Sequence, residues 1–214
     1  MIARLALALT FLSLQPAWAA SRIYSIDSKA SSVQAHVGKT GIGSFAGHEH
    51  QILAPALQGD VNADFDDLPK STVELLVNAR AMTVSEEGEP KGDAPKVQQA
   101  MRGPNVLNAA RFPLIRFRSR EVSGKKVSDT SYELRVQGDL SLHGMVKPIV
   151  VPLKVDLQGD TLTADGKLTV KQSEFGIKPT TAAGGRAGGG RGALDVPHRR
   201  AGEPLIIAWS AGTG

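Results

Sequence analysis

Residues 132–157, YELRVQGDLSLHGMVKPIVVPLKVDL, carry the pattern that decides the fold class. In the first half of this stretch apolar residues alternate with polar ones, at Leu134, Val136, Leu140 and Leu142. A period of two indicates a β-strand with one buried face and one face in water. After the turn signal His143-Gly144 and a segment leading to Pro148, apolar residues again occupy every second position. The stretch therefore predicts a long antiparallel hairpin.

The same alternation extends over most of the chain and predicts an all-β domain. It recurs at residues 23–27, 33–37, 61–65, 73–79, 115–118 and 162–170. Residues 94–110 are the one stretch with helical character, and Gly103-Pro104 should break it into short turns. Counting gives about eight to ten strands, which is typical of an antiparallel sandwich or barrel. A barrel is favoured because closure removes exposed strand edges.

Residues 1–20 have the organisation of a secretory signal. They combine the positively charged start MIAR, the apolar run LALALTFLSL and the small residues of Ala17-Trp18-Ala19 at a cleavage site. We expect cleavage after Ala19 or Ala20, and therefore export of the mature chain. An uncleaved membrane anchor is the alternative, but it would need a longer apolar run of about twenty residues.

The composition excludes several classes of function. Of the 214 residues, 41% are hydrophobic and 21% are charged, so the chain can build a full core. It has no cysteine, which excludes disulfides, thiol catalysis and cysteine-ligated metal. The formal net charge of +4 falls mostly outside the alternating segments, and no basic stripe is interleaved with aromatic residues. We therefore expect no nucleic-acid partner.

The inward-facing residues should line either a filled core or a slender tunnel, because a barrel of about eight strands permits both. They are mostly aliphatic, which suits an aliphatic chain and would not orient a polar substrate. Periodicity alone leaves the two possibilities open. The residues predicted to line a tunnel are Val33, Ala35, Phe45, Val77, Phe117, Leu140, Leu142, Val151, Leu168 and Val170.

Two histidines are candidates for metal binding. His48 and His50 are two residues apart, so they would project from one face of a strand, and His36 or His143 could add a third imidazole. Rim histidines with ordinary hydrogen bonds are the favoured interpretation, because the sequence has no further ligand spacing. A hydrolase has no support either, since there is no G-x-S-x-G motif. We therefore expect neither an enzyme nor a metal site.

Four blocks of sequence stand out: SIDSKASSVQAHVGKTGIGSFAGHEH, VLNAARFPLIRFRS, VQGDLSLHGMVKPIVVPL and KQSEFGIKP. In this order they resemble the YceI-like family of bacterial periplasmic lipid-binding proteins. The resemblance implies a lipocalin-like antiparallel β-barrel of about eight strands with one short helical segment, over residues 21–185. It also implies a periplasmic location and an apolar tunnel that holds a long-chain isoprenoid or similar amphiphilic lipid, for transport or storage.

The resemblance brings no catalytic residue, and no cofactor other than the bound lipid. Most matching positions look architectural: Asp27, Ser32, Asn108, Arg111, Phe112, Pro113, Phe117, Gly138, Leu140, Leu142, Gly144, Pro148, Phe175 and Gly176. A buried methylene gains about 0.8 kcal/mol on leaving water but little on leaving a membrane, so we expect transient membrane contact for lipid exchange. Two other hypotheses stay open: a histidine-based metal binder, and an unliganded stress-response or structural module.

Residues 186–214 depart from the pattern, because Gly and Arg dominate and the alternation ends. This tail is a flexible basic extension, a linker that carries a displaced last strand at LIIAWS (residues 205–210), or the product of a shifted reading frame near Gly185. We favour the third hypothesis because the composition changes abruptly. A barrel without its closing strand would have two free edges, which predicts low stability, homodimer formation or aggregation.

Overall fold

The computed structural model describes residues 21–37, 50–54, 57–87, 89, 91–177 and 205–212. Its strands are β1 (Arg22–Ile26), β2 (Ser32–Val37), β3 (His50–Ala54), β4 (Gln58–Ala63), β5 (Thr72–Asn78), β6 (Thr83–Val84), β7 (Leu114–Lys126), β8 (Ser131–Leu142), β9 (Met145–Gln158), β10 (Thr161–Leu168) and β11 (Leu205–Gly212). The helices are α1 (Ala94–Arg102) and two short 3-10 helices, η1 (Leu68–Lys70) and η2 (Gln172–Phe175). The predicted signal segment, Phe45 and His48 lie outside the described residues.

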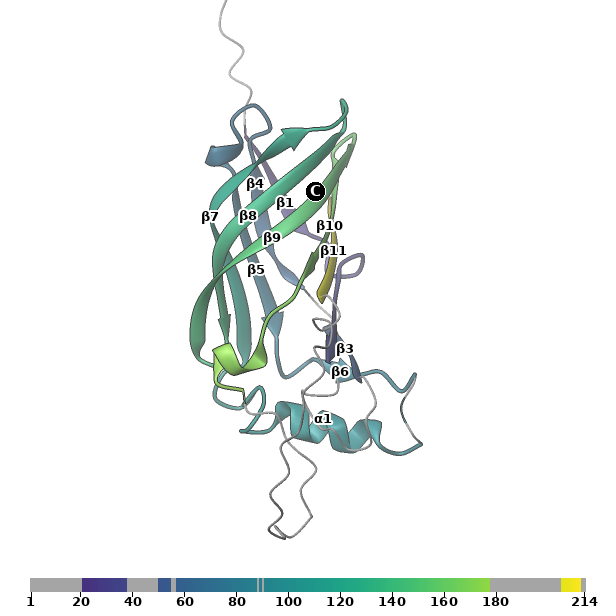
Figure 1. Cartoon of the computed structure of the whole chain (residues 1–214). Coiled ribbons are helices and arrows are strands. Elements are labelled where there is room, and N and C mark those ends of the chain that lie inside the picture. The colour runs from purple at the N-terminus through teal and green to yellow at the C-terminus, as the bar shows by residue number, and fades with distance from the viewer. Residues whose placement is uncertain are drawn as a thin grey trace, which may run out of the picture.

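The strands form one antiparallel sheet that curls into a barrel (Figure 1). The order is β1-β4-β5-β7-β8-β9-β10-β11, and β1 also pairs with β11, which closes the ring. β2 lies along the same edge of β11 as β1 and continues through β3 to β6. The fold class predicted from the alternation, an antiparallel barrel with one short helix, is confirmed.

The hairpin predicted from residues 132–157 is present as β8 and β9. The turn residues His143 and Gly144 both have positive φ, at 53° and 76°, as two-residue hairpin turns of type I′ require. One detail differs from the prediction: β9 begins at Met145, so Pro148 lies within the strand and not before it. A proline has no N–H to donate, and it is tolerated there because β9 pairs with β10 only from Leu153 onward.

A β-bulge lies opposite Gly138, where the pairing passes from Ser119↔Gly138 to Glu121↔Gln137. The register shift lies on the neighbouring strand β7, between Ser119 and Glu121. Gly138 is required for a steric reason, because a Cβ there would lie 2.7 Å from the ring of Phe117 and would also meet the carbonyl oxygen of Arg118. The glycine therefore makes room for an aromatic ring inside the barrel.

The two ends of the barrel are built differently. The upper end in Figure 1 carries η1, the β7–β8 turn and the β9–β10 turn, and the lower end carries α1, β6 and the β8–β9 turn. Helix α1 ends at Gly103, as the sequence predicts, and buries Ala94, Val97 and Met101. The Arg111-Phe112-Pro113 segment then leads into β7.

The closing strand comes from the unusual tail. β11 pairs with β10 from Leu205↔Leu168 to Ala211↔Leu162, with β2, and with β1 at Ser25 and Ile26. This position is the one foreseen for a displaced last strand. The segment that joins η2 to β11 lies outside the described residues, and the frame-shift hypothesis for it stays a prediction.

Candidate functional site: the barrel interior

The upper half of the barrel contains a small, partly open apolar cavity among the described residues. Its volume is about 30 Å³, room for about two water-sized groups. The lining is apolar except for Ser71 and comes from Val61, Ala63, Phe65, Leu68, Ser71, Val73, Val122, Leu134, Val136, Leu153, Val155, Leu162 and Ala164. Such a lining favours a dry cavity, since a bound water would lack polar partners.

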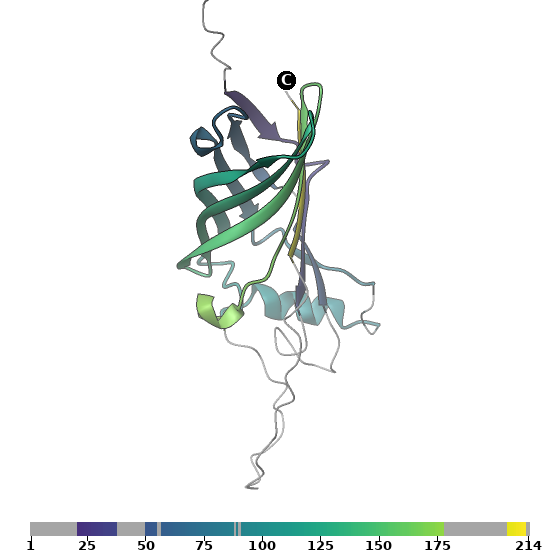
Figure 2. The same cartoon turned by 45° about the horizontal axis from the view of Figure 1, so that its top comes forward.

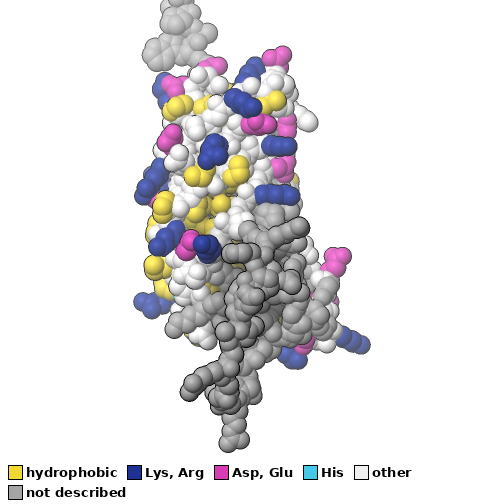
Figure 3. Space-filling model, viewed as in Figure 1, with side chains coloured by type: hydrophobic (Ala, Val, Ile, Leu, Met, Phe, Trp, Pro, Cys, Tyr) yellow, Lys and Arg dark blue, Asp and Glu magenta, His cyan; other side chains and the backbone are white. Residues whose placement is uncertain are grey.

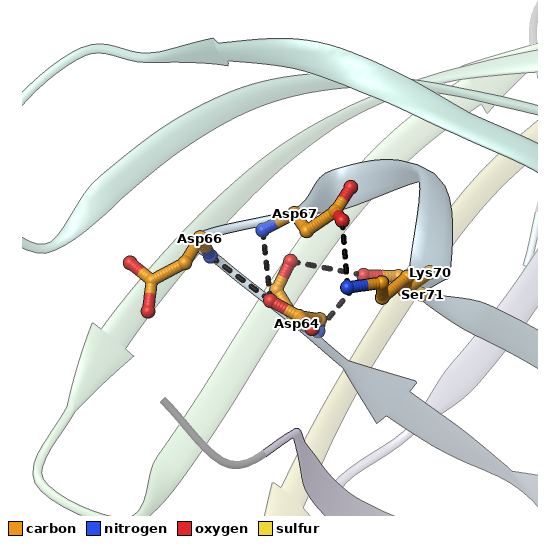
Figure 4. Close-up of polar contacts among 5 residues, drawn as sticks. All are labelled: Asp64, Asp66, Asp67, Lys70 and Ser71. Carbon is orange, nitrogen blue, oxygen red and sulfur yellow. Dashed lines mark hydrogen bonds and ion pairs between the residues drawn. The ribbon is translucent and has the colours of Figure 1, made fainter. Parts of the chain in front are cut away.

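The loop that connects β4 to β5 contributes Phe65, Leu68 and Ser71 to the lining of this cavity. Figure 4 shows the polar contacts within the loop. The Asp64 Oδ1 accepts hydrogen bonds from the backbone N–H groups of Asp66 and Asp67, at 3.2 and 2.8 Å. The Ser71 Oγ in turn accepts the N–H of Asp64 at 2.9 Å. These bonds satisfy the loop backbone locally, as Asx turns do, and they fix the loop that places Phe65 and Leu68 over the cavity.

An ion pair on the outside of the same loop adds to its order. Lys70 Nζ lies 2.9 Å from Asp67 Oδ2. The hydrogen bond and the charge of Asp67 raise the pKa of Lys70 above its ordinary value. Because the pair faces solvent, its contribution to stability is small. The order of the β4–β5 loop depends mainly on the hydrogen bonds of Asp64 and on the apolar contacts below the loop. One such contact joins the rings of Phe65 and Tyr132, whose centroids are 4.7 Å apart.

The inner face continues below the cavity without interruption. A cross-strand row of four residues, which we call the central row, runs through the register pairs Leu75↔Phe117, Phe117↔Leu140 and Leu140↔Lys147. Residues directly opposite each other in antiparallel strands share a face, so all four side chains belong to the inner face. Three of the four are apolar, and Lys147 is charged.

The burial of the inner face changes from top to bottom. Above the central row its side chains are buried, as in the series Leu134, Val136, Leu153 and Val155. At and below the central row several inward-facing apolar side chains are only half-buried although they pack against the core: Ala35, Ile115, Leu140, Leu142, Ile149, Leu168 and Val170. Solvent therefore reaches the inner face from the lower end.

The separation of β9 from β10 explains this opening. The two strands pair only between Leu153↔Gly166 and Gln158↔Thr161. Below that point β10 follows β11, while residues 145–152 of β9 pair with β8 alone. Both cartoon views show the two ribbons diverging towards the lower end (Figures 1 and 2). We call residues 145–152 the lower edge; Pro148 and Pro152 reduce its hydrogen-bonding capacity, which protects it from pairing with other chains.

The residues predicted to line a tunnel lie in the middle and lower parts of the barrel. Val33, Val77, Phe117 and Val151 are buried, and Ala35, Leu140, Leu142, Leu168 and Val170 are half-buried, while Phe45 is not described. None of the nine described residues lines the upper cavity. Residues that do line the cavity, such as Val61 and Leu162, belong to segments with the same alternation. The pattern therefore predicted that they face inward, but it did not predict that they surround a cavity.

The described histidine side chain has a structural role. The Nδ1 of His143 lies 3.0 Å from the carbonyl oxygen of Phe175, and its ring meets that of Phe112 edge-on with centroids 5.6 Å apart. The side chains of His36, His48 and His50 lie outside the described residues. Within the described ranges, no three His, Asp or Glu side chains are grouped as metal ligands, and no helix has the length and apolar character to cross a membrane.

Comparison with known proteins identifies the relatives of this barrel. The model of the YceI-like domain matches residues 24–191. The proteins named YceI from Escherichia coli O157:H7 and Shigella boydii are each 36% identical over 86 residues. That match covers 36% of this chain and 41% of each relative, so it spans less than half of either protein. The crystal structure of Burkholderia cenocepacia BcnA covers 87% of this chain and 98% of its own, with a TM-score of 0.56 at 19% identity, and shares the fold.

Proposed function

As the chain belongs to the YceI-like family, we propose that it is an exported, non-enzymatic protein that holds a long-chain isoprenoid or similar amphiphilic lipid in its barrel. One observation carries this proposal: an apolar inner face that is capped above by Phe65 and Leu68 and reached by solvent below. A face of this kind suits a slender aliphatic chain that enters from one end. The protein serves transport or storage, in the periplasm.

The aliphatic part of the lipid ligand lies in the lower half of the barrel. The upper cavity, of about 30 Å³, is too small for more than the tip of an aliphatic chain. Half-buried residues such as Leu142, Ile149 and Leu168 offer apolar surface that a ligand would cover. Each methylene buried against them contributes about 0.8 kcal/mol relative to water. A long chain therefore binds tightly from water, and exchanges readily with a bilayer, where it is already in an apolar medium.

Lipid exchange takes place at the lower end. Leu114, Met145 and Val146 are large hydrophobic residues that remain exposed there, and Arg116 lies on the adjacent register pairs between β7, β8 and β9. Figure 3 shows hydrophobic side chains along the left-hand side of the barrel, interspersed with Lys and Arg. Arg116 itself pairs with Glu74 at 3.2 Å, so the exposed apolar side chains are what suit this end to transient contact with a bilayer.

The competing hypothesis is a barrel that is filled by its own side chains and binds no ligand. The buried side chains of the upper half favour this hypothesis for that part of the barrel. Binding measurements on two variants separate the two. Leu142→Glu places a charge on the half-buried inner face, whereas Gln137→Glu places the same charge on the outer face of the same strand β8. We expect Leu142→Glu to abolish uptake of a neutral aliphatic fluorophore and Gln137→Glu to leave it unchanged. Wild-type protein that is folded and takes up no aliphatic probe would refute the proposal.

A further inference from the structure

The charged side chain of Lys147 faces the lower interior of the barrel. Its register partner on β8 is Leu140, an inward-facing member of the central row. Its neighbours along β9, Val146 and Pro148, are exposed, whereas Lys147 itself is half-buried. This alternation agrees with the inward orientation of Ile149, two residues further along.

Lys147 has no protein partner in the part of the chain that the structure describes. Three cations on the outer face of the same sheet pair across strands: Arg116 with Glu74 at 3.2 Å, Arg120 with Asp139 at 2.7 Å and Lys125 with Glu133 at 3.1 Å. Lys154, on the outer face of β9, has no such partner among the described residues and lies in solvent, whereas Lys147 lies beside the apolar inner face. No hydrogen bond or ion pair joins the side chain of Lys147 to a described residue, and Glu174, the acidic residue of the neighbouring η2, is exposed. Lys147 is half-buried as a residue, but its Nζ is not among the buried side-chain atoms without a partner. An unpaired ammonium group at the border of an apolar surface is free to pair with an anionic ligand.

The surroundings of Lys147 define the kind of anion. The other members of the central row are Leu75, Phe117 and Leu140, so the side chain of Lys147 lies beside an apolar surface, the wall of the interior. Lysine side chains commonly lay their methylene stem along such a wall and keep the charged end at its border. Lys147 also belongs to the lower edge, where β10 has separated from β9 and no described strand other than β8 pairs with β9. A ligand that satisfies both wall and charge has an aliphatic chain and an anionic head.

We propose that Lys147 binds the carboxylate or phosphate headgroup of the ligand, whose aliphatic chain lies along the central row, so that the protein selects anionic single-chain amphiphiles. This assignment rests on the proposed function and names the ligand class for the same interior. The bond is a charge-assisted hydrogen bond from Nζ to a headgroup oxygen.

The test compares Lys147→Met with Lys154→Met. Both changes remove a lysine from β9, but Lys154 lies on the outer, exposed face. The ligands are hexadecanoate, hexadecyl phosphate and hexadecanol, measured by displacement of the neutral probe N-phenylnaphthylamine. We expect Lys147→Met to weaken the two anionic ligands by about ten- to a hundredfold, and to leave hexadecanol and the probe itself unchanged. Lys147→Arg should retain most of the affinity for the anions, and Lys154→Met should behave as wild type.

Several outcomes would overturn the assignment. Equal affinity of wild-type protein for hexadecanoate and hexadecanol, unchanged by Lys147→Met, would remove Lys147 as the anchor while leaving the lipid-binding function intact. Equal losses in Lys147→Met and Lys154→Met would reduce the effect to net charge. Displacement by inorganic phosphate or acetate as effective as that by the long-chain anions would show a site for free anions. Failure of wild-type protein to bind any chain, or the probe, would refute the proposed function itself.

Discussion

The Nδ1 of His143 lies 3.0 Å from the carbonyl oxygen of Phe175 and so ties the β8–β9 turn to η2. The ring of Phe112 packs against the same turn from the other side, edge-on to His143 and close to Gly144. Three segments that are distant in sequence therefore meet at the lower end of the barrel. This junction holds the start of β9, and with it Lys147, in place.

The junction should be sensitive to any side chain added at the turn. Gly144 has φ 76°, and a Cβ there would lie 2.6 Å from the Cε1 of Phe112. Gly144→Ala therefore combines a left-handed backbone with a clash, and should lower the free energy of unfolding by about 2–4 kcal/mol. Gly159→Ala is the matched control, since Gly159 has φ 60° with nothing within 4 Å of its Cβ position. It should cost only about 1–2 kcal/mol. Urea unfolding of both variants measures the difference, and equal losses would contradict the packing described.

The opening of the lower interior predicts a difference in chemical reactivity along β10. The natural chain has no cysteine, so single cysteines can be introduced and labelled specifically. Leu168 is half-buried and Leu162 is buried, and both face inward from the same strand. We expect Leu168→Cys to react with a maleimide at least about tenfold faster than Leu162→Cys, because thiol reactivity requires access. Saturation with an aliphatic ligand should slow the reaction at residue 168. Equally slow labelling at the two positions would show that the lower interior is closed.

Membrane contact through the lower end predicts that an acidic residue there slows lipid exchange. Val146 is 59% exposed at the lower end, and Val127 is 57% exposed in the β7–β8 turn at the upper end. Val146→Asp should reduce the rate of lipid uptake from anionic vesicles severalfold, because it removes apolar contact and adds repulsion. Val127→Asp should leave the rate unchanged. The same reduction in both variants, in a stopped-flow transfer assay, would place the membrane contact elsewhere.

The alternation of apolar and polar residues was sufficient to predict most strands of the barrel. The strands that it did not place were missed for physical reasons. β3 was not predicted, because the strand is short and, of its four residues with described side chains, only Ile52 and Ala54 are buried. β11 follows a Gly- and Arg-rich segment that hid its relation to the sheet. Its place next to β10 depends on pairing across the whole barrel, which no local pattern encodes.

The candidate site could be predicted only in part. The parity of Leu140, Leu142 and Val151 placed them on the inner face, and the structure puts them there. Lys147 was not recognised as inward-facing, because Pro148 suggested that the strand began after it. The proline is accommodated only because β10 leaves β9 above it. The separation of β10 from β9 also exposes the lower part of the inner face. The inward orientation of Lys147 and this exposure were therefore both missed for the same reason.

The lipid-binding account is tested most directly by analysing what the protein carries. Mature protein, purified without detergent, is extracted with organic solvent and the extract is analysed by mass spectrometry, beside an intact-mass measurement of the folded protein. The account predicts a stoichiometric long-chain isoprenoid or similar lipid, absent from an extract of the Leu142→Glu variant prepared in the same way. Folded, monomeric wild-type protein whose extract is empty, and which takes up no aliphatic chain afterwards, would contradict it.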